Sequence, residues 1–383
     1  MGNKEQNHLD FLLRFEGITD PRIERHKLYT LKEVLFLTIS AVISGCSGWE
    51  AIADFGKAKL AWLRQYLAYP NGAPSDDTLN RVIGLIDYRS FEAFFISWVE
   101  GMALSVGGKV INIDGKKLRA SVDKALQNKP RAEGGRASVH LVEAWCSELQ
   151  LCLGQYKTED KSNEITAIPA LLDLLEISGC TVTIDAMGCQ KDIASKIVGK
   201  QADYILGLKD NQPTLHSAVK ELFDTFNGPT QDDLRDNGGH GRIELRGCRT
   251  LPAALLPACL REGWEGLTTL VEIQSERLIL ASGAYCAEER HYLGSKVQSS
   301  ALYNQQVRAH WGIENQLHWS MDVTFGEDKS RKRAANSAQN FGLIRRIALN
   351  LLKTREEKPK VSLSRRMNLC SLSDDYRQQT LRF

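Results

Sequence analysis

The spacing of apolar residues changes partway along the 383-residue chain, and this change constrains the fold more than any other sequence feature. In the first part, apolar side chains recur at helical spacing, over residues 31–43 and 49–55 and after a cap at Ser75. A polar turn with glycine at residues 69–74 precedes that cap, as in small helical DNA-binding units, although most helical bundles bind no DNA. We therefore predict an all-helical N-terminal domain over residues 1–105 and consider it a candidate for DNA binding.

From about residue 109 onward, short apolar runs alternate with helical segments. The runs that resemble strands lie at residues 110–113, 139–145, 152–156, 181–184 and 204–208, with a helical pattern at residues 165–177 among them. This order predicts an α/β sheet, in which functional residues lie at the carboxyl ends of strands. Asp114 and Asp185 directly follow two of the runs and should be exposed there, and a glycine follows each of them closely. A lone aspartate at such a place is usually a turn former, but two of them favour a site.

The stretch after residue 208 differs from the runs before it. It turns to helix and then to short strands at residues 242–246 and 267–273, which predicts a β-rich insertion at about residues 215–295. Helical patterns return near residue 304 and at residues 341–352. We predict a single α/β domain over residues 106–352 that contains this insertion.

Carboxylates from separate elements are what two-metal phosphoryl transfer requires. Glu314 is the third candidate beside the two aspartates, because His310 and His318 flank it at four-residue intervals and all three share one helical face. That face also permits a rival hypothesis, a single zinc ion held by the two histidines and the glutamate. Helical zinc sites use the pattern His-Glu-x2-His, which is absent here, as are the signatures of ATP, nicotinamide and serine-hydrolase chemistry.

Positive charge is concentrated near the C-terminus. Residues 329–366 hold twelve Lys and Arg against two acids, a local charge of +10, although the whole chain carries only +2. Such asymmetry is typical of proteins that bind polyanions, because each Lys or Arg on a phosphate releases condensed counterions. The candidate DNA contacts are Lys329, Arg331, Lys332 and Arg333, and residues 353–383 are predicted to form a basic C-terminal tail. The alternative is a solvated basic tail without a partner.

Composition places the chain among ordinary globular proteins. Its longest uncharged run is shorter than the ~20 apolar residues that a membrane-spanning helix needs, and no apolar leader follows the first residues. The nine cysteines include no Cys-x2-Cys pair, which argues against a disulfide framework and a zinc knuckle. We expect reduced thiols, no membrane contact and a cytoplasmic location.

Several motifs together resemble the DDE transposases of bacterial insertion sequences, in the subgroup that contains the H-repeat-associated proteins. The resemblance covers most of the chain. Its motifs are residues 111–116 (INIDGK), 161–169 (KSNEITAIP), 183–190 (TIDAMGCQ), 208–212 (LKDNQ), 240–244 (HGRIE), 310–315 (HWGIEN) and 317–325 (LHWSMDVTF). In one respect the chain departs from the wider group, which places Tyr, Arg and Lys around the glutamate where this chain has Val307, His310 and Met321. The roles of those three residues are therefore not transferred.

The resemblance implies an RNase H-like catalytic core in which Asp114, Asp185 and Glu314 hold two Mg²⁺ ions, with Mn²⁺ able to substitute. It implies metal-dependent cleavage and strand transfer on double-stranded DNA, at transposon ends and target, by a homodimer assembled on that DNA and associated with the nucleoid. A catalytically silent or decayed DNA-binding relative is the alternative. The presence of all three acids favours a competent enzyme.

Overall fold

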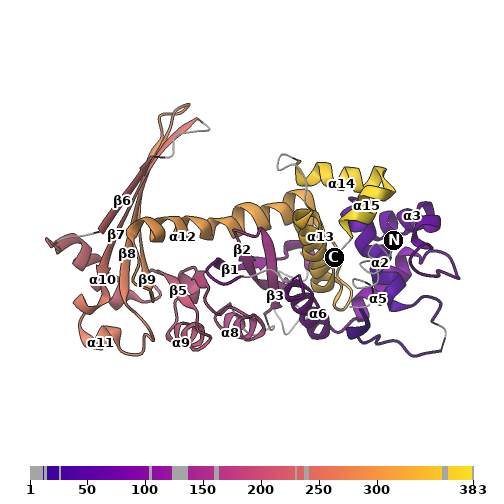
Figure 1. Ribbon diagram of the computed structural model, residues 1–383, viewed down its shortest axis with the longest axis horizontal. Helices are drawn as coiled ribbons and strands as arrows, with labels where there is room; N and C mark the ends of the chain where they lie inside the picture. Colours follow the sequence, from indigo (N-terminus) through magenta and orange to yellow (C-terminus); the bar gives the residue numbers. More distant parts are fainter. Residues whose placement is uncertain are drawn as a thin grey trace, which may run out of the picture.

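The computed structural model describes residues 12, 15–25, 27–102, 106–122, 137–158, 164–228, 231–236, 241–355 and 361–381. Figure 1 shows an elongated molecule with most of the helices, and both chain ends, gathered at one end and an extended antiparallel ribbon of strands at the other. A mixed sheet and one long helix join the two ends. The fold is therefore mixed α/β, as the alternation of strand and helix patterns predicts.

The N-terminal part of the described chain is helical. After the 3-10 turn η1 (Phe15–Gly17) come α2 (Leu31–Ile43), α3 (Trp49–Ala58), α4 (Leu60–Leu63), α5 (Asp76–Leu85) and α6 (Tyr88–Glu100). Helix α2 begins at a capping box in which the Thr30 hydroxyl accepts from the Glu33 backbone and the Glu33 carboxylate accepts from the Thr30 backbone. Because α2 is apolar on nearly all sides, it is buried. Helices α3 and α5 pack around it together with α13 (Ser337–Thr354), a helix from much later in the chain.

A nine-stranded sheet runs through the rest of the molecule in the order β3-β2-β1-β4-β5-β9-β8-β7-β6. Its strands are β1 (Val110–Lys117), β2 (His140–Cys146), β3 (Leu151–Lys157), β4 (Thr181–Ile184), β5 (Asp203–Leu208), β6 (Gln231–Asp236), β7 (Arg242–Pro252), β8 (Thr269–Ile279) and β9 (Tyr285–Gly294). The three central strands β1, β4 and β5 are parallel to one another, and every other pairing is antiparallel. The strands after residue 230 thus extend the same sheet rather than forming a second one.

Strand β1 is longer than the apolar pattern predicts. The sequence places its end at Ile113, but the strand continues to Lys117 because β2 stays paired with it, Asp114 facing Glu143. On the other side, pairing with β4 stops where Ile113 faces Ile184. One edge of β1 is therefore open from Asp114 onward.

Helices cover both faces of the sheet. On one side lie α8 (Glu164–Leu174), α9 (Lys191–Gly199) and α10 (Pro213–Thr225), and on the opposite side α12 (Ser300–Gly312) lies across the strands (Figure 1). Helix α12 continues as two stretches of π-helix, η6 (Ile313–His318) and η7 (Ser320–Thr324), where the sequence predicts uninterrupted α-helix. Short elements complete this part: η2 (Arg119–Ser121), η4 (Ala186–Gly188), η5 (Ala253–Leu255), α11 (Ala258–Arg261) and η8 (Glu327–Lys329).

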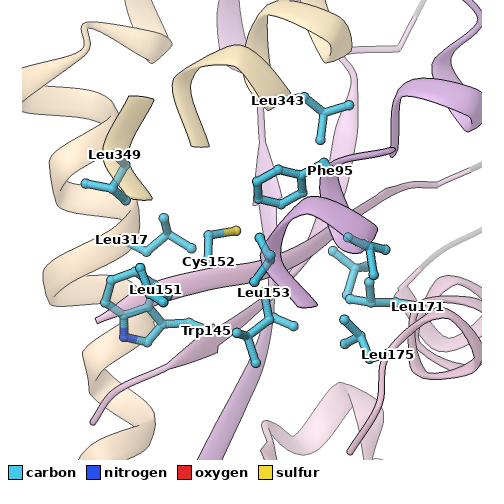
Figure 2. Close-up of a cluster of buried hydrophobic side chains, with 14 of the residues drawn as sticks. Phe95, Trp145, Leu151, Cys152, Leu153, Leu171, Leu175, Leu317, Leu343 and Leu349 are labelled. Atoms are coloured by element: carbon cyan, nitrogen blue, oxygen red, sulfur yellow. The ribbon is translucent and has the colours of Figure 1, made fainter. Parts of the chain in front are cut away.

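One continuous hydrophobic core joins the helical end to the sheet. Figure 2 shows Phe95 of α6, Leu153 of β3, Leu171 of α8 and Leu343 of α13 in a single cluster. Because α13 packs on both α2 and β3, residues more than 180 positions apart in sequence share this core. Helix α6 thus packs directly on β3, whereas α2 and α5 pack on α13, a helix from a distant part of the chain.

The C-terminal residues that the structure describes are not an extended tail. They form α14 (Leu363–Leu372) and α15 (Asp374–Thr380), and α14 packs on α2 and α13. Met367, Cys370 and Leu381 are buried there. The prediction of a tail relied on the basic residues of this segment. The apolar residues between them are buried, and their burial holds the two helices against the rest of the protein. In the described residues, no helix combines the length and apolar character that crossing a membrane requires.

Candidate active site

The parallel pairing of β1 and β4 brings Asp114 and Asp185 together. Ile113 and Ile184 are the last partners in this pair of strands, so the two aspartates follow side by side. The Asp114 carboxylate accepts a hydrogen bond from the Gly115 backbone at 2.8 Å, and the Asp185 carboxylate accepts one from Met187 at 3.1 Å, where it caps η4. Two carboxylates are therefore fixed by backbone contacts at one edge of the sheet.

The surroundings of these carboxylates disfavour their charged forms. Asp114 is 18% exposed, less than the sequence predicts for an acid at a strand end, because β1 continues past it and helical residues cover it. Burial raises the pKa of Asp114 to about 7, the nearby His318 opposes the rise, and the charges of Asp185 and Glu164 add to it. Burial and then Glu164 also raise the pKa of Asp185. Acids that destabilise one another in this way are suited to binding a cation.

Side-chain alternation turns both aspartates toward α12. Asn112 and Asp114 lie on one face of β1, and Thr183 and Asp185 on the matching face of β4. The Asn112 amide donates to the Thr183 hydroxyl at 2.7 Å, and that hydroxyl lies 2.9 Å from Nδ1 of His310 on α12. Burial lowers the pKa of His310 to about 4, so this imidazole is neutral. These contacts dock α12 on the sheet just before the aspartates.

His318 anchors the π-helix that follows. Its Nδ1 lies 3.8 Å from an Asp114 oxygen, and its Nε2 lies 3.1 Å from an oxygen of the buried Glu143. Glu143 in turn accepts a hydrogen bond at 2.6 Å from the fully buried Arg346, which also binds both carboxylate oxygens of Glu327. A chain of polar side chains thus connects helix α13 to Asp114.

Glu314 lies between these two anchors. Its side chain is exposed, and within the described residues it makes no hydrogen bond or ion pair. Since His310 reaches Thr183 and His318 reaches Asp114, Glu314 projects from the stretch of helix that spans the two aspartates. The structure therefore brings Asp114 and Asp185 together and positions Glu314 on the covering helix without a contact to them.

The zinc hypothesis receives no support from this arrangement. His310 and His318 contact different partners, and in the part of the chain that the structure describes the one group of three potential ligands within 4.8 Å of one another is Glu272, Glu289 and His291. The three predicted acids do not gather that closely either. Glu272 already accepts two hydrogen bonds from Arg249, at 2.7 and 2.9 Å.

Glu164 is a further carboxylate beside the aspartates, and it is not among the candidate site residues predicted from the sequence. It is the first residue of α8, its Oε1 lies 2.8 Å from Nε2 of His140, and its side chain is 12% exposed. The sequence feature that could have indicated Glu164 is the motif at residues 161–169, of which residues 161–163 lie outside the described part of the chain. His240, from the motif at residues 240–244, also lies outside it. Spacing alone gives no reason to connect this glutamate with Asp114.

The predicted DNA contacts near residue 330 have different environments. Lys329, Arg331 and Arg333 are exposed, and Arg333 donates to the Ala120 carbonyl at 3.1 Å. Lys332 is buried: its ammonium donates to the Ser47 carbonyl at 2.5 Å and lies 3.9 Å from the ring centre of Phe341. Burial lowers the pKa of Lys332 to about 7. Its position in the core is incompatible with the phosphate contact that the sequence predicts for it.

An arginine-lined hollow lies next to Glu314, between α12 and the strands β7, β8 and β9. It has a volume of about 520 Å³ and is bordered by Asn315 and Gln316. Two glutamates line it together with five arginines: Glu244, Glu288, Arg242, Arg246, Arg277, Arg290 and Arg308. The Arg290 guanidinium stacks 4.6 Å from the ring centre of Trp311, which also lines the hollow. No sequence pattern reveals this cluster, because its residues are dispersed over four elements.

Comparison with known proteins assigns the chain to a family. The Transposase DDE domain family matches residues 106–351, and a family described as DDE_Tnp_1-associated matches residues 12–99. The chain is 40% identical over 353 residues to "Putative transposase YncI" of Escherichia coli O157:H7, covering 91% of this chain and 87% of that protein. It is 39% identical over 356 residues to "H repeat-associated putative transposase YhhI" of Escherichia coli strain K12, covering 91% of each.

Among solved structures, the piggyBac transposase synaptic complex with hairpin DNA matches with a TM-score of 0.48 and 12% identity, over 98% of this chain and 82% of that one. The family matches define the class of the protein, the DDE transposases. Within this class, the chain belongs to the bacterial insertion-sequence transposases whose relatives include the H repeat-associated proteins. The resemblance drawn from the sequence motifs is thereby confirmed.

Proposed function

We propose that this protein is an active transposase with an RNase H-like core, which cleaves DNA at the ends of its insertion sequence and joins them to target DNA. The observation that carries the proposal is that Asp114 and Asp185 lie side by side directly after the last residue pair of the parallel strands β1 and β4. Glu314 completes the site from the helix that His310 and His318 fix over these aspartates. The N-terminal helices and the strands β6 to β9 are then additions to the catalytic core.

The carboxylates fit the two Mg²⁺ ions that such an enzyme uses. All donors are hard oxygens, which suit Mg²⁺ and Mn²⁺ better than softer metals. Burial and the charges of neighbouring carboxylates raise the pKa values of both aspartates, and a bound cation relieves that repulsion. When bound, the ions would supply activation of water or a 3′-hydroxyl and stabilisation of the leaving oxygen. The chain itself holds the aspartates by backbone hydrogen bonds and sets Asp114 through His318.

The first test is DNA cleavage by the purified full-length chain, with DNA that carries the terminal repeats of its own element and with Mg²⁺, Mn²⁺ or Ca²⁺. We expect Asp114→Asn, Asp185→Asn and Glu314→Gln each to abolish cleavage while leaving DNA binding intact, because metal ligands act as a unit. Calcium should support binding only. Normal cleavage by either aspartate variant would exclude this site, and normal cleavage by Glu314→Gln alone would remove that residue from it. A wild-type protein that binds the ends but never cuts them would indicate a decayed relative.

We further propose that double-stranded DNA lies across the arginine-lined hollow and the exposed Lys329, Arg331 and Arg333. The five arginines and two glutamates leave this hollow with a net charge of about +3 beside the helix of Glu314. Arg242, Arg277 and Arg308 are 44–50% exposed and reach no closer than 3.8 Å to Glu244, so their guanidinium groups remain accessible to phosphates. Two copies of the chain, one for each end, would assemble on the DNA as a homodimer.

The salt dependence of DNA binding tests this path. Replacing Arg242, Arg277 and Arg308 together with Ala should flatten the plot of log K against log salt by up to about 0.9 for each phosphate contact, or about 2–3 in total. A second triple variant at Lys329, Arg331 and Arg333 tests the predicted segment in the same way. Alanine substitutions at the exposed Lys57, Lys191 and Lys220 serve as the control. Fluorescence anisotropy on one duplex gives the slopes, and a slope equal to that of the control would exclude the corresponding surface.

A further inference from the structure

We infer that Glu164 is an additional carboxylate ligand of the metal site, contributed by α8 beside Asp114 and Asp185. The inference rests on the proposed metal-dependent function and extends it to a residue outside the predicted triad. It gives a role to the motif at residues 161–169, which the triad leaves unexplained.

The path of the chain places Glu164 at the open edge of β1. Helix α8 packs on β2 and β3 and contacts η4, the turn that directly follows Asp185. Its first residue therefore lies where pairing between β1 and β4 has ended. A carboxylate there approaches the aspartates from the side of the sheet opposite α12.

Gly115 leaves the space that the Glu164 carboxylate occupies. A Cβ atom at Gly115 would lie 1.9 Å from Oε1 of Glu164 and 2.3 Å from its carboxyl carbon. Since the backbone φ of Gly115 is not in the left-handed region, the glycine is required for this close approach and not for its conformation. The glycine directly after Asp114 thus leaves room for the Glu164 carboxylate, and a side chain at this position would displace that carboxylate.

Like charges gather where Glu164 approaches the two aspartates. Its carboxylate lies against Gly115, which follows Asp114, and its helix α8 contacts η4, which follows Asp185. Three carboxylates in a partly buried space repel one another, and the imidazole of His140, 2.8 Å from Glu164, offsets a charge only if it is protonated. His318 lies 3.8 Å from Asp114, and Lys209 is a basic group near Asp185. A bound divalent ion supplies the compensation that these side chains leave incomplete.

The alternative is that Glu164 only anchors α8 through His140. That role would use one ion pair at a site where the imidazole is 35% exposed, and such pairs contribute little to stability. It would not explain why the carboxylate is held against Gly115, next to Asp114. In the ligand role, His140 is a positioning residue that orients the carboxylate.

Isothermal titration of the full-length protein with Mn²⁺, without DNA, tests the inference independently of cleavage. We expect Glu164→Gln to weaken Mn²⁺ binding at least about tenfold, since even the loss of an outer-shell partner costs ~10–100-fold in metal affinity. Glu176→Gln is the matched control, because it removes an equal charge from an exposed residue just beyond the far end of α8. Circular dichroism melts of each variant show whether the fold is retained. Unchanged Mn²⁺ affinity in folded Glu164→Gln would overturn the inference.

A double-mutant cycle with Gly115→Ala gives a second, independent measurement. The added Cβ should displace the Glu164 carboxylate and weaken Mn²⁺ binding in the wild-type background, but have little further effect when residue 164 is already Gln. Fully additive effects would mean that Gly115→Ala acts on Asp114 and would contradict the ligand role. Asp114→Asn separates the two proposals. If Asp114→Asn also leaves Mn²⁺ binding unchanged, the proposed metal site itself is wrong. If Asp114→Asn abolishes Mn²⁺ binding while Glu164→Gln leaves it unchanged, only the ligand role of Glu164 is refuted.

Discussion

At the scale of single residues, the position of Asp114 depends on two strands and one helix. The apolar run before it predicts a strand, but its degree of burial is set by β2, which keeps β1 extended beyond it, and by His318 from the covering π-helix. A strand-end acid that would otherwise be solvated becomes an acid with a pKa of about 7. The chemical character of this residue therefore comes from its neighbours.

The raised pKa of Asp114 predicts how stability depends on pH in the metal-free protein. Between about pH 4 and 7 the folded state holds a proton that the unfolded state has lost, so stability falls as pH rises through this window. Asp114→Asn removes the titrating group and should stabilise the protein at pH 8 by about 1–3 kcal/mol, and at pH 5 by only about a third of that, because most of the window lies above pH 5.

Urea unfolding in EDTA at the two pH values measures the difference. Asp54→Asn, at an exposed position, is the control, and its effect on the free energy of unfolding should be the same at both pH values. An equal effect of Asp114→Asn at pH 5 and pH 8 would contradict the raised pKa.

At the scale of elements, helix α13 is tied to the sheet through ions as well as apolar contacts. Arg346 is fully buried and hydrogen-bonds to Glu143 of β2 and to Glu327 of η8. Glu143 continues to His318, so α13 supports the π-helix that carries Glu314. At the other end of this helix, Gly312 allows close packing, because a Cβ there would lie 2.5 Å from the Ser147 hydroxyl.

Removing Arg346 should leave the buried carboxylates of Glu143 and Glu327 without their ion pair to this arginine. We expect Arg346→Met to destabilise the protein by about 3–5 kcal/mol, the usual cost of breaking a buried ion pair from one side. The exposed Arg331→Met should change stability by less than about 0.5 kcal/mol. Denaturant unfolding of both variants measures this difference, and a small effect at Arg346 would mean that water or neighbouring groups compensate the glutamates.

At the scale of the whole molecule, the basic residues that cluster in the sequence are not the ones that cluster on the surface. Lys332, Arg345, Arg346 and Arg366 belong to the +10 segment, yet all four are buried. Conversely, the five arginines of the hollow are far apart in sequence and meet only in the folded protein. Net charge in a sequence window is therefore a weaker guide to a DNA-binding surface than the folded arrangement.

The docked C-terminal helices predict the effect of truncation. Deleting residues 356–383 removes Met367, Cys370 and Leu381 from the core and the buried Arg377, which lies 4.0 Å from the ring centre of Trp62. We expect the free energy of unfolding to fall by about 3 kcal/mol or more. The burial of a large apolar side chain contributes ~1.5–3 kcal/mol, and the deletion removes three apolar side chains. Unfolding by urea and limited proteolysis measure the loss, with the exposed Arg365→Ala as control. A solvated tail would leave the unfolding midpoint unchanged.

The sequence by itself determined the helical start of the chain, the alternating strands and helices, the family and the two strand-following aspartates. Those features depend on local periodicity and on short motifs, which neighbouring residues carry. Only the tertiary structure decided that Asp114 is partly buried, that Glu164 lies beside it, that Lys332 is in the core and that arginines converge next to Glu314. Each of these depends on contacts between residues far apart in the chain, and strand pairing and helix packing create such contacts only when the whole molecule folds.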